Sequence, residues 1–141
     1  MKDAWEKKIQ RSGKRMTPIR RALFDFFEHC TSPVSLEDIQ KKCFGKKYSA
    51  DFATVYRQLE TLVGEGILNR SDVPGKKQYY EVRNTHHHHF LCTKCEEIQC
   101  LEEQVIRESL EKVFLQMQKQ GMDINSHVLS LSGICKKCKN N

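Results

Sequence analysis

HHHHFLCTKC, residues 86–95, and CKKC, residues 135–138, are the stretches that decide how the second half of this chain folds. Each contains two cysteines separated by two residues, so both thiolates of a pair can turn back onto one metal ion. Two such pairs complete the tetrahedral four-thiolate shell that Zn²⁺ prefers. The sequence therefore predicts a structural zinc site made by Cys92, Cys95, Cys135 and Cys138.

The two cysteine pairs are far apart in the sequence, so the predicted zinc ion would tie together two distant stretches of one domain. A redox role is the alternative, in which each pair forms a disulfide or a thioredoxin-like active site. Two matched pairs favour zinc, because this repetition is a recurrent zinc pattern whereas one pair alone is ambiguous. The odd number of cysteines, seven, also argues against a secreted disulfide framework.

The length and charge of the chain indicate a small protein with one basic part. Its 141 residues suit one ordinary domain or two small ones. Residues 1–83 hold 17 Lys and Arg against 11 Asp and Glu, whereas residues 84–141 hold 7 of each. Such asymmetry is expected when one domain binds a polyanion, although a solvated face has the same composition. With no predicted membrane span or signal peptide, we expect a cytoplasmic protein.

Three helices are predicted in the basic half. Thr17 and Pro18 suit the N-cap and first position of a helix that ends near His29. Ser35 caps a second helix that ends at Gly45. A third helix begins near residues 49–51 and ends at the glycines at 64 and 66, with an inner stripe expected from Phe52, Val55, Leu59 and Leu62.

Residues 67–70 and 78–82 follow as two short strands joined by a basic turn, which predicts a hairpin. Helices followed by such a hairpin describe a winged helix-turn-helix, whose third helix enters the major groove of DNA. The side chains of that helix that face outward or sideways become candidate DNA contacts: Thr54, Tyr56, Arg57 and Gln58. Arg57 and Gln58 can read base edges. Alternatively, Tyr56 and Arg57 only cover a helix surface.

Three motifs occur in a diagnostic order: ATVYR at residues 53–57, HHHHFLCTKC at 86–95, and His127 eight residues before CKKC. Together they resemble the ferric uptake regulator (Fur) superfamily of bacterial metal-responsive repressors. The resemblance covers nearly the whole chain and implies an α+β protein. It would have an N-terminal winged helix-turn-helix domain (1–82), a hinge (83–85) and a small C-terminal α/β dimerisation domain (86–141). Residues 101–120 suit the helix of that second domain, and residues 128–132 suit one strand.

The resemblance also implies partners and site residues. The chain would be a homodimer that binds double-stranded operator DNA, with no membrane association and no enzymatic activity. Lys14 or Arg15 would reach the minor groove, and Tyr56 and Arg57 would contact DNA from the third helix. A regulatory metal site would use Glu81, His87 and His89, with Cys100 in place of the usual carboxylate. An additional metal site would use His86, His88, His127 and either Glu108 or Glu111.

Strand geometry is consistent with two metal sites near the four histidines. Alternate residues of a strand point to opposite faces, so His87 and His89 can share one metal while His86 and His88 serve another. The regulatory metal is expected to be Fe²⁺, Mn²⁺ or Zn²⁺, in addition to the structural Zn²⁺ of the cysteines.

The resulting prediction is a metal-dependent transcriptional repressor with iron as the leading signal. Two departures from the superfamily pattern keep the alternatives open: Pro33 stands where iron and peroxide sensors have a histidine, and Cys100 replaces a carboxylate. Imidazole and carboxylate suit Fe²⁺ or Mn²⁺, whereas a thiolate favours zinc or redox chemistry. A peroxide- or zinc-sensing member is the alternative within the superfamily. Outside it, the alternatives are a thiol redox sensor that uses Cys100 and a zinc enzyme, although the H-E-x-x-H motif is absent.

Overall fold

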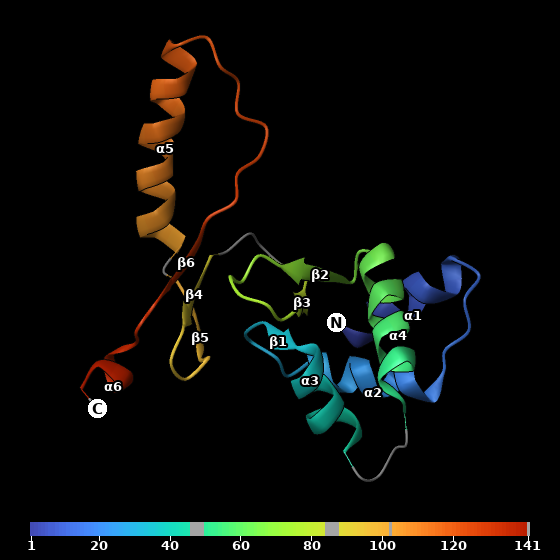
Figure 1. Cartoon of the computed structure of the whole chain (residues 1–141). Coiled ribbons are helices and arrows are strands. Elements are labelled where there is room, and N and C mark those ends of the chain that lie inside the picture. Colours follow the sequence, from blue (N-terminus) through green and yellow to red (C-terminus); the bar gives the residue numbers. More distant parts are fainter. Residues whose placement is uncertain (46–49, 84–87, 102, 141) are drawn as a thin grey trace. The chain divides into compact units, whose positions relative to one another are not determined.

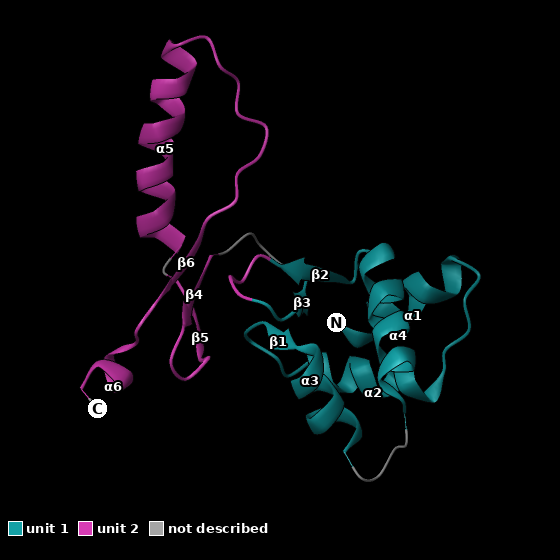
Figure 2. Cartoon of the chain, viewed as in Figure 1, with its two compact units in different colours: residues 1–71, 76–84 teal, residues 72–75, 85–141 magenta. Residues whose placement is uncertain are grey.

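The computed structural model describes residues 1–45, 50–83, 88–101 and 103–140. The chain forms two compact units (Figure 2): unit 1 comprises residues 1–71 and 76–84, and unit 2 comprises residues 72–75 and 85–141. Of the predicted hinge, residues 84 and 85 lie outside the described residues, as do His86 and His87 of the histidine run. Within the described ranges, no helix is both long enough and apolar enough to span a bilayer.

Unit 1 has the order of elements of a winged helix (Figure 1). Its antiparallel sheet has the order β1-β3-β2, and β2 and β3 are the two arms of the predicted hairpin. The elements are α1 (Lys2–Arg11), α2 (Pro18–Phe27), β1 (Val34–Ser35), α3 (Leu36–Ile39), the π-helix η1 (Gln40–Phe44), α4 (Phe52–Gly64), β2 (Leu68–Ser71) and β3 (Tyr79–Val82).

Side-chain caps fix the starts of the three helices predicted from the sequence. Thr17 Oγ1 accepts a hydrogen bond from the Arg20 backbone N–H at 3.3 Å at the start of α2. Ser35 Oγ caps α3 in the same way, and the Asp51 carboxylate accepts from the Thr54 N–H at 2.6 Å at the start of α4. These bonds satisfy backbone donors that have no partner inside the helix. The Thr54 N–H also lowers the pKa of Asp51.

An apolar core joins the helices of unit 1 to its sheet. Its fully buried side chains include Leu23, Phe24, Phe27, Ile39, Phe44, Val55, Leu59, Leu62 and Tyr80. Helix α1, which was not predicted from the sequence, adds Ile9 and Trp5, whose ring centroid lies 5.4 Å from that of Phe24.

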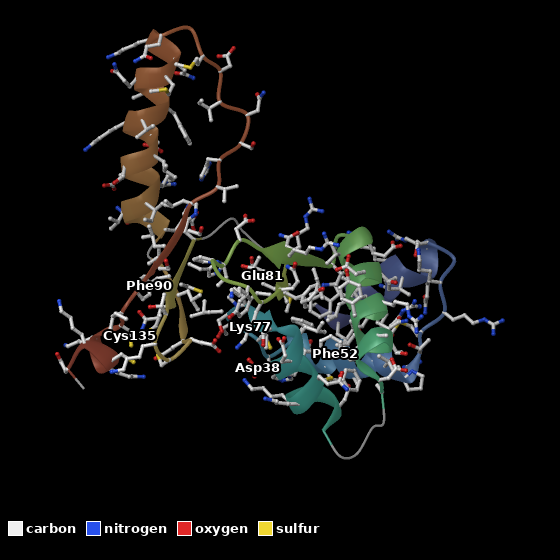
Figure 3. The ribbon with its side chains drawn as sticks, viewed as in Figure 1. Asp38, Phe52, Lys77, Glu81, Phe90 and Cys135 are labelled. Carbon is white, nitrogen blue, oxygen red and sulfur yellow. The ribbon has the colours of Figure 1, made fainter. Side chains whose placement is uncertain are left out.

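The prediction that Phe52 belongs to the buried stripe of α4 is wrong. Phe52 is 50% exposed, because it is the first residue of the helix and lies almost one turn before Val55, the first buried side chain (Figure 3). Val55, Leu59 and Leu62 are buried as expected. Burial of α4 therefore begins one turn after its N-terminus.

Glu60 attaches α4 to the hairpin. The Tyr80 hydroxyl donates to Glu60 Oε1 at 3.0 Å, and Arg70 of β2 forms an ion pair with the same carboxylate. Arg70 lowers the pKa of Glu60, whereas burial raises the pKa of Tyr80. Helix α4 is thus held from two sides, by the core and by the hairpin.

Unit 2 is built around a three-stranded sheet of order β5-β4-β6. Its elements are β4 (His89–Cys92), β5 (Ile98–Cys100), α5 (Glu103–Lys119), β6 (Ser130–Gly133) and α6 (Lys136–Lys139). Strand β4 is antiparallel to β5 and parallel to β6. Helix α5 extends away from this sheet (Figure 1), and none of its described side chains is buried.

Candidate metal sites and nucleic-acid interface

Four cysteine thiols meet at one end of the sheet of unit 2. Cys92 ends β4, Cys95 lies in the following turn, and Cys138 lies within α6. Cys135, which is labelled in Figure 3, immediately precedes α6 as its N-cap. The four sulfur atoms all lie within 4.8 Å of one another, and the Sγ atoms of Cys95 and Cys135 are 3.8 Å apart. Tetrahedral zinc with Zn–S bonds of about 2.3 Å requires sulfur separations of about 3.8 Å. The cluster therefore fits a structural zinc ion.

Strand pairing brings the two cysteine pairs together. In the parallel pairing of β4 with β6, Cys92 lies opposite Gly133, and the Thr93 N–H donates to the Gly133 carbonyl at 2.7 Å. A Cβ atom at residue 133 would lie 3.3 Å from the Phe90 ring, so glycine allows β6 to approach β4 closely. Two residues later the chain reaches Cys135, beside the first cysteine pair.

Backbone N–H donors stabilise negatively charged sulfur in this cluster. The Cys135 N–H donates to Cys92 Sγ at 3.3 Å, and this bond, together with a bond from the Cys95 N–H, lowers the pKa of Cys92 to about 6. Its neighbour Cys138, which shares a hydrogen bond with Cys95, has its pKa raised to about 12. Adjacent thiolates repel one another, so a divalent cation is needed for all four sulfurs to ionise together.

A second cluster contains two of the predicted histidine ligands. The Nε2 atoms of His88 and His127 are 3.4 Å apart, and both rings line a cavity of about 140 Å³. Glu111 also lines this cavity, whereas Glu108 accepts a hydrogen bond from Gln104. The cavity is further lined by Glu103, Arg107, Leu110 and Phe114. Within the described residues, the cysteines alone form a group of three or more potential ligands at metal-binding spacing.

The predicted regulatory ligands are distributed over both units. Glu81 belongs to β3 of unit 1 (Figure 3). His89 and Cys100 lie directly opposite each other in the antiparallel pairing of β4 with β5. His89 is 3% exposed, whereas Cys100 is exposed. The structure thus pairs an imidazole with a thiol in unit 2, and His87, the remaining predicted ligand, lies outside the described residues.

The candidate DNA contacts lie on α4 and on the segment before α2. Tyr56 is 42% exposed and Arg57 is also exposed, its guanidinium 3.4 Å from Thr54 Oγ1. Before α2, Lys14 Nζ lies 2.5 Å from the Glu65 carboxylate, and Arg15 is exposed.

Gln58, the fourth candidate on α4, has a partner that was not predicted from the sequence. Its Oε1 accepts a hydrogen bond from Arg20 at 2.9 Å. Arg20 shares the buried side of α2 with Leu23, Phe24 and Phe27. The sequence held one indication that Arg20 is buried, namely its helical spacing from these three core side chains.

Replacing Cys135 with serine tests the assignment of zinc to the cysteine cluster. The loss of one thiolate should reduce bound zinc from about one ion per chain to well below half, because serine is a poor zinc ligand at neutral pH. Mass spectrometry of the metal content and circular dichroism would measure the zinc loss and the accompanying loss of structure. The matched control is Cys30→Ser in unit 1, where serine can keep the hydrogen bond to the Phe26 carbonyl. Equal zinc contents in the two variants would contradict the assignment.

Comparison with known proteins identifies the family. The model of the ferric uptake regulator family matches residues 11–132. The ferric uptake regulation protein of Neisseria meningitidis is 29% identical over 133 residues, which cover 93% of this chain and 90% of that protein. Its counterpart in Vibrio parahaemolyticus is 32% identical over 111 residues, covering 77% of this chain and 72% of that protein.

Solved structures show the same fold. The ferric uptake regulator of Helicobacter pylori superposes with a TM-score of 0.83 at 20% identity, covering 99% of this chain and 94% of that one. The iron-containing regulator of Francisella tularensis has a TM-score of 0.76 at 26% identity, covering 90% and 96%. This chain, in which four clustered cysteines could hold a zinc ion, belongs to the ferric uptake regulator family of metal-dependent transcriptional regulators.

Proposed function

We propose that this protein is a cytoplasmic repressor that binds operator DNA when a regulatory metal is bound, with Fe²⁺ as the leading signal. The observation that carries this proposal is the exposed Tyr56–Arg57 segment of α4, which lies in the basic half of the chain. The second unit adds two candidate metal ligands that lie opposite each other, His89 and Cys100. The relatives named ferric uptake regulation proteins support iron as the signal.

The proposed mechanism couples metal binding to the arrangement of the two units. Glu81 belongs to unit 1, whereas His89 belongs to unit 2 and His87 comes two residues after the predicted hinge. A metal that binds all three residues would favour one arrangement of the units over the others. A ligand shifts such an equilibrium only through its difference in affinity for the two states. The metal would therefore select the arrangement that fits the operator.

Zinc sensing is the second candidate, and one observation favours it. Cys100 lies opposite His89 across β4 and β5, which places a thiol and an imidazole at cross-strand distance. This donor pair suits Zn²⁺ better than it suits Fe²⁺ or Mn²⁺. Related solved structures include a zinc-bound manganese uptake regulator and a peroxide-sensing regulator from Streptococcus pyogenes. The exposed thiol of Cys100 also makes oxidation an alternative signal.

Metal titrations with three variants test the proposed function. DNA binding would be followed by fluorescence anisotropy on duplexes enriched from a random library, under anaerobic Fe²⁺, Mn²⁺ or Zn²⁺. Glu81→Gln and His89→Ala should each reduce the metal-induced gain in affinity by about tenfold or more, because each removes a ligand. Glu81→Gln preserves side-chain shape and so controls for misfolding of the buried His89 variant.

Cys100→Ser separates the two candidate signals. If zinc is the signal, this variant should weaken the response to zinc alone. If iron is the signal, it should leave the response to iron intact. Unchanged metal dependence in both ligand variants would contradict the mechanism.

We also propose that the protein is a homodimer joined through unit 2. This unit leaves many large apolar side chains exposed: Val105, Val113, Leu115, Met122, Ile124, Val128, Leu131 and Ile134. Exposed apolar side chains in this number are costly in water and are expected at an interface between subunits. The α5 residue Val113 is 50% exposed, and its neighbour Lys112 is also exposed.

Sedimentation velocity of Val113→Glu tests the dimer. A charge introduced on the buried side of an interface should raise the dimer dissociation constant by about tenfold or more. Lys112→Glu is the control, because it places the same side chain at the adjacent, solvated position. A wild-type protein that sediments as a monomer at micromolar concentration would contradict the dimer. Equal dissociation constants for both variants would exclude this face of α5 from the interface.

A further inference from the structure

Arg20 is a buried cation at the junction of the parts that the proposed function assigns to DNA binding. It is 9% exposed and lies on α2, which packs beside α4 in unit 1 (Figure 1). Its Nε–H donates to Gln58 Oε1 at 2.9 Å, and its Nη1 donates to the Arg15 carbonyl. One guanidinium therefore connects the recognition-helix candidate with the segment proposed to reach the minor groove.

The chemistry of this contact fixes which way the Gln58 amide faces. A guanidinium has donors and no acceptor, so the Gln58 atom that faces Arg20 must be the carbonyl oxygen and not the nitrogen. The Nε2 amino group of Gln58, which has two donors, is then turned away from Arg20. Reading adenine through both amide atoms needs the oxygen to point at N6 while the amino group points at N7, whereas here the oxygen points at Arg20. The contact with Arg20 favours the amino group alone as the contact to a base.

We propose that Arg20 is a positioning residue that presents Gln58 to DNA as a hydrogen-bond donor. This inference rests on the proposed DNA-binding function. At the position facing Gln58, the protein would favour guanine, whose O6 and N7 both accept in the major groove, or thymine through O4. Adenine N7 also accepts, but the neighbouring N6 amino group of adenine would then find no acceptor on Gln58. The protein would not favour adenine by paired contacts to N6 and N7.

The partners of Arg20 supply an independent test that requires no DNA. Its guanidinium donates to two neutral oxygens, and among the described residues it forms no ion pair with a carboxylate. A carboxylate at residue 58 would convert the contact into a charge-assisted bond to a largely buried cation. The same change would remove the donor from the DNA-facing amide and add a negative charge beside phosphates. Stability and DNA affinity should therefore move in opposite directions.

Thermal unfolding tests the Arg20–Gln58 contact itself. Gln58→Glu should raise the Tm by about 2–4 °C at pH 7. The gain should disappear as the pH falls below about 4, because the pKa of a paired carboxylate is depressed and protonation removes its charge. When Gln58→Glu is introduced into an Arg20→Met background, it should give no gain in Tm over Arg20→Met alone. An equal gain with and without Arg20, or a fall in Tm for Gln58→Glu, would overturn the contact.

Base preference tests the positioning role. Sites enriched from a random duplex library by wild-type protein should show one position that prefers guanine or thymine. Arg20→Lys keeps the charge but loses the planar fork, and should weaken that preference about three- to tenfold. Arg21→Lys, at the exposed neighbouring position of α2, is the matched control and should leave the preference unchanged.

The two readouts separate the failure of this inference from that of the proposed function. Unchanged base preference in Arg20→Lys would overturn the positioning role, even if the unfolding data support the contact. If wild-type protein enriches no sequence under any metal, the proposed function fails. The unfolding data then still decide whether Arg20 binds Gln58, and the inference about base selection falls with the function on which it rests.

Discussion

The four sulfur atoms of Cys92, Cys95, Cys135 and Cys138 are the constraint on which unit 2 depends. The buried apolar side chains of the described part of this unit are few, and α5 contributes none. A small unit without a substantial core needs a metal or a partner subunit to offset the entropy of ordering its chain. The zinc-compatible cluster joins the end of β4 to the start of α6, and so closes a loop of about forty residues that contains β5, α5 and β6.

Unit 1 is stabilised in a different way. Its helices and sheet share a core of fully buried aliphatic and aromatic side chains, and polar bonds from Arg20 and Glu60 hold α4 in place. None of these interactions involves a metal. The surface of α4 that we propose to contact DNA can therefore stay folded while the metal state of the chain changes. This suits a regulator in which metal alters the arrangement of the units and not the recognition surface itself.

Local chemistry explains which parts of this structure could be predicted from the sequence. Features that depend on a few neighbouring residues can be predicted from the sequence. They include the helix caps at Thr17 and Ser35, the β2–β3 hairpin and the cysteine pairs. Helix α1 was missed because Trp5 and Ile9 are its only buried apolar residues in an otherwise polar segment. The burial of Arg20 was missed because arginine is rarely buried unless it is paired, and its partner lies 38 residues away.

For the same reason, some parts of the candidate sites could be predicted from the sequence and others could not. The Nε2 atoms of His88 and His127 lie 3.4 Å apart, and the pairing of β4 with β5 places Cys100 opposite His89, so each of the two predicted ligand sets has two members close together. The choice of Glu111 over Glu108 as a lining residue depends on how α5 is rotated, which spacing in the sequence does not fix. The joint use of Glu81 and His89 depends on how two separate units are arranged, and no local pattern encodes that.

The central claim is that zinc keeps unit 2 folded whereas an apolar core keeps unit 1 folded. Hydrogen exchange measured by mass spectrometry, with and without a zinc chelator, tests it most directly. Removal of zinc should abolish amide protection in β4, β5 and β6, because their order depends on the cysteine cluster. Protection in α2, α4 and β3 should remain. Uniform loss of protection in both units, or full protection of β4 and β6 after complete zinc removal, would contradict the account.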